Sequence, residues 1–204
     1  MIAIVDYGMG NLRSVYNAFR KVSPNLKVCV TSDQKIIQSA DRIVFPGQGA
    51  MPDCMRELAN KNLTETIINA AKNKPFLGIC IGLQMLNDFS EEGGVSGLGI
   101  IPGQVRKFNT KNHFNKVPHM GWNEVYRKNN HFMWNGINNN ERFYFVHSYF
   151  VQPKDQSISA AETIYEHPFC CAISKDNIFA VQFHPEKSSL AGLQLLKNFT
   201  RWSI

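Results

Sequence analysis

The chain has 204 residues, enough for one domain that buries about 70% of the surface its unfolded form exposes. Its 44% apolar and 19% charged residues are ordinary for a globular protein, and no apolar run approaches the roughly 20 residues that cross a bilayer. The lysines and arginines behind its net charge of +6 are dispersed, which disfavours a nucleic-acid partner. We therefore expect a single domain over residues 1–204, with neither a membrane nor a nucleic acid as partner.

The five cysteines are odd in number and lack paired C-x-x-C spacing, which disfavours a disulfide framework and a zinc site. Reduced thiols are the simpler interpretation. The chain enters an apolar run at residues 2–5 without the basic and small-residue features of a secretory leader. Both observations predict a cytoplasmic protein.

The first half of the chain alternates short apolar runs with stretches of helical periodicity. Buried strands are predicted at 2–5, 26–30, 42–45 and 76–79. Helices are predicted at 12–22, 51–59, 63–72 and 82–89. Such alternation predicts a three-layer α/β fold, in which helices cover both faces of a mostly parallel central sheet. Ligands of such folds gather at the carboxyl ends of the strands.

The second half is richer in β-type segments, which predicts an additional, smaller β-rich portion. Strands are expected at 103–108, 142–146, 158–164, 169–173 and 178–183. A final helix is expected to place four apolar residues on one face, namely Leu190, Leu193, Leu196 and Phe199.

One cysteine stands where a predicted strand turns directly into a predicted helix. Cys80 lies between Gly78 and Gly82, a spacing like that of the G-x-S-x-G nucleophile elbow with sulfur in place of oxygen. The positive end of a helix favours a thiolate there, and the N–H of Ile81 can donate to an oxyanion. The alternative is a purely structural cysteine, which is the interpretation we give to the other four, because they lack flanking glycines of this kind.

A thiolate nucleophile needs an imidazole and a group that orients the ring. Among six histidines, only His184 directly follows an apolar strand and has a carboxylate, Glu186, two residues later. Pro185 biases His184 toward an extended backbone, so that the side chains at 184 and 186 can project to one side. His-Pro-Glu alone is a weak signal, and the prediction of a Cys80–His184–Glu186 triad rests on its combination with the elbow.

Two other glycine clusters also follow predicted strands. In the first, backbone N–H groups at Gln48 and Gly49 can face the nucleophile, although an ordinary strand-to-helix turn is the alternative. The second, at residues 8–10, fails as a dinucleotide fingerprint because Arg13 stands where a third glycine is required.

These motifs together resemble the class I (triad) glutamine amidotransferases over essentially the whole chain. The class-level motifs are residues 78–84 and 184–186. Further segments resemble the branch formed by glutaminase subunits of imidazole glycerol phosphate synthase, at 6–12, 117–123, 145–149 and 186–188. The resemblance implies a flavodoxin-like fold, hydrolysis of L-glutamine through a thioester, and transfer of ammonia to a (βα)8-barrel cyclase in a heterodimer of histidine biosynthesis.

The resemblance also implies roles for individual residues. Substrate contacts are expected at Gln84, Glu92, Ser148 and Tyr149. Partner contacts are expected at Asn11, Trp122 and Lys187, where the alternatives are a core aromatic for Trp122 and a solvated lysine for Lys187. Gln48 departs from the apolar residue typical of the family, which matters little if the donor is a backbone N–H. No cofactor is implied, because thiolate, imidazole, carboxylate and backbone donors suffice for amide hydrolysis.

Other functions remain open at this point. The chain can be a paralogous glutaminase that feeds another synthase, such as one of a surface-sugar pathway. It can also be a cysteine hydrolase that acts alone on peptides or esters, since the elbow and histidine serve any acyl transfer. A catalytically silent subunit that stabilises a synthase is a further possibility. His119 and His147 are interpreted as structural residues.

Overall fold

The computed structural model describes residues 1–109 and 116–204. At its centre, five parallel strands lie side by side in a mixed sheet. In spatial order they are β2 (Val28–Thr31), β1 (Ile2–Val5), β3 (Arg42–Gly47), β4 (Phe76–Cys80) and β13 (Ile178–Val181). The order jumps from β4 to β13, so two strands that are about a hundred residues apart in the sequence lie side by side in the sheet.

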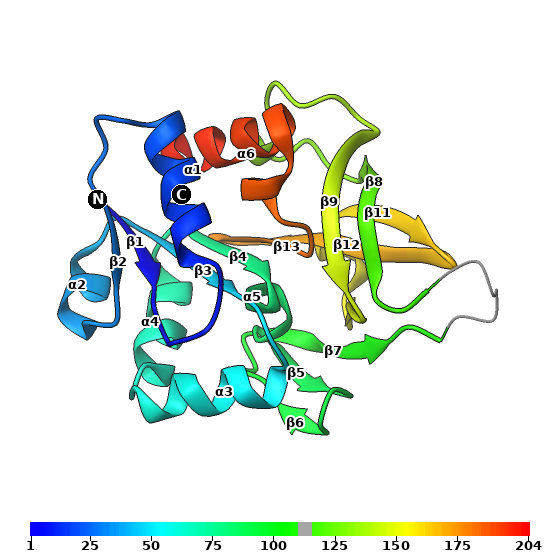
Figure 1. Cartoon of the computed structure of the whole chain (residues 1–204), viewed down its shortest axis with the longest axis horizontal. Helices are drawn as coiled ribbons and strands as arrows, with labels where there is room; N and C mark the ends of the chain where they lie inside the picture. Colours follow the sequence, from blue (N-terminus) through cyan, green and yellow to red (C-terminus); the bar gives the residue numbers. More distant parts are fainter. Residues whose placement is uncertain (110–115) are drawn as a thin grey trace.

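Helices cover both faces of these parallel strands (Figure 1). One face carries α1 (Leu12–Val22) and α6 (Ser189–Arg201), and the other carries α2 (Gln34–Ser39), α3 (Met51–Asn60) and α4 (Thr64–Asn73). Within β1, Ile2 and Ile4 join the apolar core on the first side, whereas Ala3 and Val5 join the core on the second. Burial on both faces explains why these strands are apolar throughout, and it confirms the predicted three-layer α/β fold.

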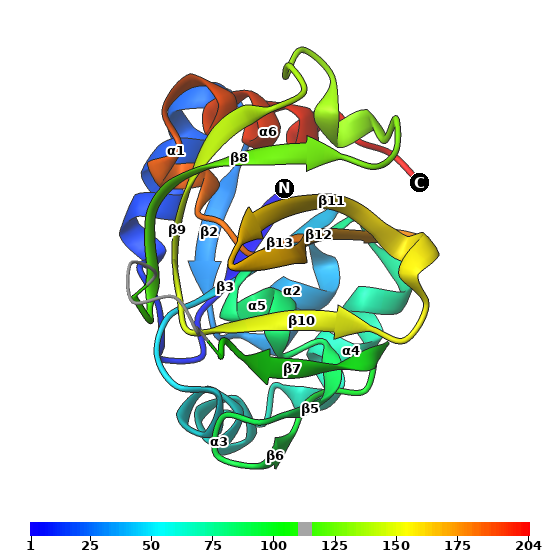
Figure 2. The same cartoon turned by 90° about the vertical axis from the view of Figure 1, so that its right-hand side faces the viewer.

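The sheet continues beyond β13 as a β-rich portion of mainly antiparallel strands (Figure 2). The continuing strands are β12 (His167–Lys175), β10 (Tyr149–Pro153), β7 (Ile101–Lys107), β5 (Asn87–Ser90) and β6 (Val95–Ser96). Three more branch from β12, namely β11 (Ser159–Tyr165), β8 (His119–Arg127) and β9 (Glu141–His147). Short 3-10 turns occur at η1 (Phe132–Trp134), η2 (Gln156–Ile158) and η3 (Pro185–Lys187).

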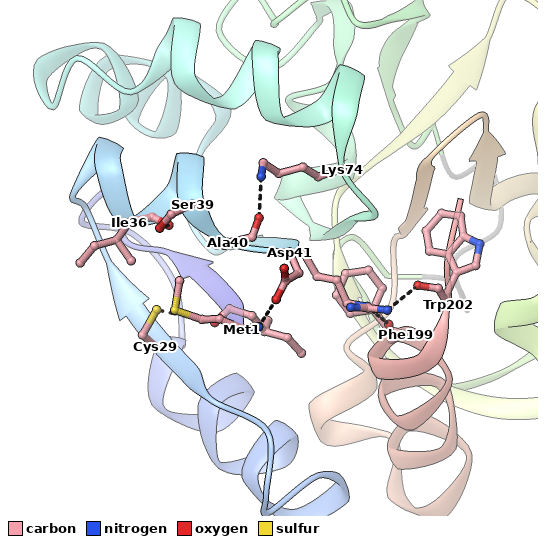
Figure 3. A network of polar contacts seen from close by, with 11 residues as sticks. Met1, Cys29, Ile36, Ser39, Ala40, Asp41, Lys74, Phe199 and Trp202 are labelled. Atoms are coloured by element: carbon pink, nitrogen blue, oxygen red, sulfur yellow. Dashed lines mark hydrogen bonds and ion pairs between the residues drawn. The ribbon is translucent and has the colours of Figure 1, made fainter.

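The two ends of the chain are tied to the start of β3 (Figure 3). Arg42 donates from Nε to the carbonyl of Phe199 at 3.1 Å and from Nη2 to the carbonyl of Trp202 at 2.9 Å. The amino group of Met1 pairs with the carboxylate of Asp41. A guanidinium at the carboxyl end of α6 satisfies carbonyls that have no partner within the helix, so it holds α6 across the parallel strands.

The predicted helix over residues 82–89 is wrong. Helix α5 (Ile81–Gln84) lasts one turn, and the chain then forms β5. The side chain of Asn87 donates to the carbonyls of Leu83 and Gln84 at 3.0 and 3.3 Å, and the N–H of Leu98 donates to the carbonyl of Met85 at 2.8 Å. The backbone carbonyls that would accept the next hydrogen bonds of the helix therefore accept from the Asn87 side chain and from the backbone of Leu98 instead.

The predicted apolar face of the last helix is also partly wrong. Leu190 is 81% exposed and Leu193 is only partly buried, whereas Leu196 and Phe199 are buried as predicted. Leu195, which was not predicted to face the core, is buried with them. Residue 190 lies in the first turn of α6, where Gly192 faces the protein: a Cβ at that glycine would lie 1.9 Å from the Pro185 carbonyl oxygen. In the part of the chain that the structure describes, no helix is long and apolar enough to span a bilayer.

Candidate active site

The strand-to-helix elbow predicted around Cys80 is present. Cys80 ends β4 and precedes α5 with φ 56° and ψ −111°, a backbone conformation that a side-chain-bearing residue rarely adopts. A Cβ at Gly82 would lie 1.9 Å from the carbonyl oxygen of Phe45, and one at Gly78 would lie 3.0 Å from the Cβ of Ala180. Glycine at both positions lets β3 and β13 pack closely around the turn that presents the thiol.

Three neighbouring parallel strands end beside this cysteine. Gly47 of β3 is the register partner of Cys80, and Val181 of β13 is the partner of Ile79. The residues after Val181 therefore emerge at the same edge as Cys80. Carboxyl ends of parallel strands are the usual place for a ligand in an open α/β sheet.

His184 and Glu186 meet beside this edge, in and just before the turn η3. His184 Nδ1 lies 2.9 Å from Glu186 Oε1, and the two side chains are only 2% and 1% exposed. Strand β9 holds the turn in place: the His184 N–H donates to the Tyr144 carbonyl at 2.9 Å, and Ser188 Oγ accepts from the Tyr144 N–H at 2.9 Å. Because a carboxylate accepts hydrogen bonds, Nδ1 carries a proton and the other ring nitrogen is left for chemistry.

His184 lines the same cavity as Cys80, and the pKa of its ring differs from the ordinary value of a histidine. Burial lowers the pKa of His184, but interactions with the Cys80 thiolate and the Glu186 carboxylate outweigh burial and raise that pKa to about 10. Nε2 makes no well-formed hydrogen bond within residues 1–109 and 116–204. Hydrogen bonds between a nucleophile and its base often tighten only once substrate is bound. The raised pKa keeps the ring of His184 protonated at neutral pH, next to the cysteine that would carry acyl transfer.

Backbone donors lie on the other side of the nucleophile. Gly49 has φ +118°, which favours glycine, and the Gln48 carbonyl accepts a contact from Cys54 Sγ at 3.7 Å. That contact ties the turn to α3. Ile81 is the first residue of α5, so its N–H has no acceptor within the helix. These groups can stabilise an oxyanion formed next to Cys80.

One cavity of about 280 Å³ brings most of the predicted site residues together. Its lining comprises Gln48, Gly49, Cys80, Ile81, Gln84, Glu92, Pro118, Val146, His147, Ser148, Tyr149 and His184. The volume is at the small end of ligand pockets, which run from roughly 300 to 1,000 Å³. It suits a single small molecule better than an extended peptide. Glu92 also accepts from the Met51 N–H at 2.8 Å, at the start of α3.

Comparisons with known proteins agree with this geometry. A family model described as "Glutamine amidotransferase class-I" matches residues 3–202. Two proteins called "Imidazole glycerol phosphate synthase subunit HisH" are each 58% identical to the chain. The match to the one from Nitrosospira multiformis covers 98% of this chain and 97% of that protein. The match to the one from Aromatoleum aromaticum covers 99% of this chain and 98% of that protein. The chain belongs to the class I glutamine amidotransferases, among the HisH subunits.

Solved structures support the class I fold at low identity. The glutaminase domain of Trypanosoma brucei CTPS with bound acivicin superposes with a TM-score of 0.69 and 18% identity, covering 100% of this chain and 94% of that one. A structure described as a glutamine amidotransferase superposes with a TM-score of 0.74 and 13% sequence identity, and the match covers 98% of both chains. At such identities the likeness shows the fold alone.

The residues expected to face a partner lie on another surface of this class I amidotransferase. Trp122 is 51% exposed, so the alternative of a core aromatic is wrong. Trp122, Glu186 and Lys187 line a second, open cavity of about 510 Å³ beside α1 and α6. Asn11 immediately precedes α1 and is partly exposed. Glu186 therefore lies between His184 and this second cavity.

Two polar residues near the nucleophile were not among the site residues predicted from the sequence, and one of them, His147, was interpreted as structural. His147 lines the substrate-sized cavity, and Gln182 Nε2 lies 3.7 Å from Cys80 Sγ. The position of Gln182 directly after an apolar strand and two residues before His184 was the available signal. Within residues 1–109 and 116–204, no group of three or more His, Cys, Asp or Glu side chains is placed to hold a metal ion.

Proposed function

We propose that this chain hydrolyses L-glutamine to glutamate and ammonia with Cys80, His184 and Glu186, and passes the ammonia to a (βα)8-barrel cyclase in a heterodimer. The proposal depends most on the buried His184–Glu186 pair, whose Nδ1 and Oε1 atoms are 2.9 Å apart, next to a thiol on a strained strand-to-helix turn. The near full-length likeness to HisH subunits supports glutamine as substrate and a cyclase as partner. The cyclase would use the ammonia to form imidazole glycerol phosphate and aminoimidazole carboxamide ribotide.

In the proposed mechanism, the Cys80 thiolate attacks the side-chain carboxamide carbon of glutamine. The backbone N–H groups of Ile81 and of the Gln48–Gly49 turn stabilise the oxyanion. His184 gives its proton to the departing nitrogen, so ammonia leaves and a thioester remains. A water molecule then attacks the thioester and yields its proton to His184. Glutamate leaves and the thiolate is restored.

The walls of the cavity offer complementary groups to an amino acid. Glu92 provides a carboxylate for the α-ammonium group, and Ser148 and Tyr149 also line the cavity. Gln84 is 3% exposed, and its side-chain oxygen has no partner among the described residues. A buried acceptor without a donor is costly, so a donor on the substrate would stabilise the complex.

The partner surface in this proposal includes Asn11, Trp122 and Lys187. Two large apolar side chains close to these residues in the sequence are also exposed, Met120 at 62% and Leu190 at 81%. A partner that covers them would remove this apolar surface from water. The proposal also places the enzyme in the cytoplasm, where a subunit with five unpaired cysteines keeps its thiols reduced.

Glutaminase assays with and without the barrel subunit and its nucleotide ligand test the proposal. We expect little turnover by the isolated chain and strong activation in the complex. Cys80→Ala should reduce activated turnover by about 10⁴-fold or more, because removal of a nucleophile eliminates the covalent route. Cys29→Ala, at a partly buried thiol of β2, is the matched control and should retain activity.

Intact activated turnover in Cys80→Ala would contradict the mechanism. Fast turnover of simple esters or peptides by the isolated chain would instead favour a hydrolase that acts alone. Activation by a synthase other than the imidazole-forming cyclase would identify a paralogue.

A further inference from the structure

Gln182 lies beside the nucleophile on the adjacent strand end. It follows β13, and because Val181 pairs with Ile79, Gln182 is level with Cys80 across the two parallel strands. The side chain is fully buried, with 0% exposure. Its Nε2 lies 3.7 Å from Cys80 Sγ, a normal separation for a hydrogen bond from nitrogen to the larger sulfur atom.

The direction of this contact is imposed by a backbone carbonyl. The carbonyl of Tyr149 can only accept, so the amide nitrogen of Gln84 faces it, at 3.1 Å. The same nitrogen of Gln84 lies 3.0 Å from the side chain of Gln182, which must therefore present its oxygen. The amide nitrogen of Gln182 is then left to face Cys80. Reversal of the Gln182 amide would place nitrogen against nitrogen and oxygen against sulfur, and would lose two hydrogen bonds.

We propose that Gln182 is a catalytic residue whose amide N–H donates to Cys80 Sγ, stabilising the thiolate and aiming it at the substrate. The inference deepens the proposed function and depends on Cys80 being the nucleophile. Hydrogen bonds to a charged acceptor are about twice as strong as those between neutral groups, and burial strengthens them further.

Gln182 supplies a hydrogen-bond donor that keeps its proton throughout the reaction, which His184 does not. The imidazolium attracts the thiolate, but the mechanism consumes its proton when ammonia leaves. An amide does not ionise, so the Gln182 N–H is available to the sulfur in every step, including the one in which the thioester breaks and the thiolate reforms. The hydrogen-bonded series from Tyr149 through Gln84 to Gln182 also links one wall of the substrate cavity to the nucleophile.

The test is the pH dependence of Cys80 alkylation by iodoacetamide in the full chain, with the modified cysteine identified by peptide mass. Gln182→Met keeps a similar length and removes the donor. We expect its alkylation midpoint to rise by about one pH unit, which is roughly a tenfold lower rate below the midpoint. In the activated complex, kcat should fall about tenfold with little change in KM, because the contact acts on the nucleophile.

Two further variants separate this role from a structural one. Gln182→Glu keeps an oxygen that accepts from Gln84 but replaces the donor with a negative charge, so its midpoint should rise further than that of the methionine variant. Thr163→Val removes another fully buried polar group, on β11 and outside the cavity, and should leave the midpoint unchanged.

An unchanged midpoint in folded Gln182→Met would overturn the inference. If that variant fails to fold, an unchanged midpoint in Gln182→Glu would do so. An unchanged midpoint in either variant would leave the proposed function intact, provided that glutamine turnover still requires Cys80. Glutamine turnover that survives Cys80→Ala would overturn both proposals.

Discussion

Two groups of buried histidines lie close together in this molecule and differ in the groups that contact them. His184 hydrogen bonds to the Glu186 carboxylate and interacts with Cys80, whereas His147 and His119 bond to each other, with their ring nitrogens 2.9 Å apart. Burial is the largest influence on all three rings. The pKa of His184 nevertheless rises to about 10, while burial lowers that of His147 to about 3 and that of His119 to about 4.

The His119–His147 pair has only neutral partners, and these fix its protons. The Tyr149 carbonyl, 2.7 Å from His147 Nδ1, can only accept, so Nδ1 is protonated and Nε2 is an acceptor. His119 Nδ1 must then donate to it. His119 Nε2 is left to accept from the Asn123 amide at 3.3 Å. Every hydrogen bond in the series is satisfied only while both rings are neutral.

The comparison shows that burial alone keeps a histidine neutral, and that nearby anions keep a buried histidine protonated at neutral pH. A raised pKa means that His184 contributes stability below about pH 6.5, which is lost as the pH rises through about 10. The lowered pKa values of His119 and His147 mean that these residues stabilise the fold above about pH 6.5 and lose that contribution as the pH falls. Since His147 bonds to the backbone of Tyr149, that pair supports the substrate wall rather than the proton transfer.

The largest effect is expected when the anion beside His184 is removed. Glu186→Gln keeps an oxygen that can accept from Nδ1 but loses the charge, so the pKa of His184 should fall and activated glutamine turnover should drop about 10²- to 10³-fold. Steady-state kinetics of the complex across pH measure both. Glu65→Gln, on the exposed side of α4, is the control and should have normal kinetics. Wild-type turnover in Glu186→Gln would remove Glu186 from the mechanism.

An intermediate effect is expected on the pH dependence of stability. The unfolded chain binds a proton at His119 below about pH 6.5 and the folded chain does not, so stability falls as the pH drops from there toward 4. His119→Phe retains an aromatic ring next to Phe145 and Tyr165. Urea unfolding should show a pH dependence flatter by up to about 1.4 kcal/mol per pH unit. An equal slope in both proteins would contradict the neutral pair.

The smallest effect is expected at the end of the histidine series. Asn123→Ala removes the donor to His119 and a hydrogen bond to the Ile164 carbonyl at 2.9 Å. The side chain is partly exposed, so water can replace it, and the free energy of unfolding should fall by about 1 kcal/mol at neutral pH. The change of the free energy of unfolding with pH should stay close to that of the wild type. A loss of several kcal/mol would mean that Asn123 orders the pair.

The elbow and the parallel strands could be predicted because their causes are local in the sequence. Gly78, Cys80 and Gly82 lie within five residues, and one strand-to-helix turn fixes their relation. The adjacency of His184 and Glu186 is equally local. Apolar runs such as β1 are buried on both faces wherever the sheet places them, so their composition alone identifies them.

Other features depended on contacts between distant residues. The segment from Asn87 to Ser90 is a strand because it pairs with β6 and β7, although its local pattern favoured a helix. Gln182 meets Cys80 only because β13 lies beside β4, about a hundred residues away along the chain. The sequence by itself determined which residues can carry acyl transfer. Strand register decided which of them meet and which groups surround each buried histidine, because hydrogen bonding and charge act over a few ångströms in space.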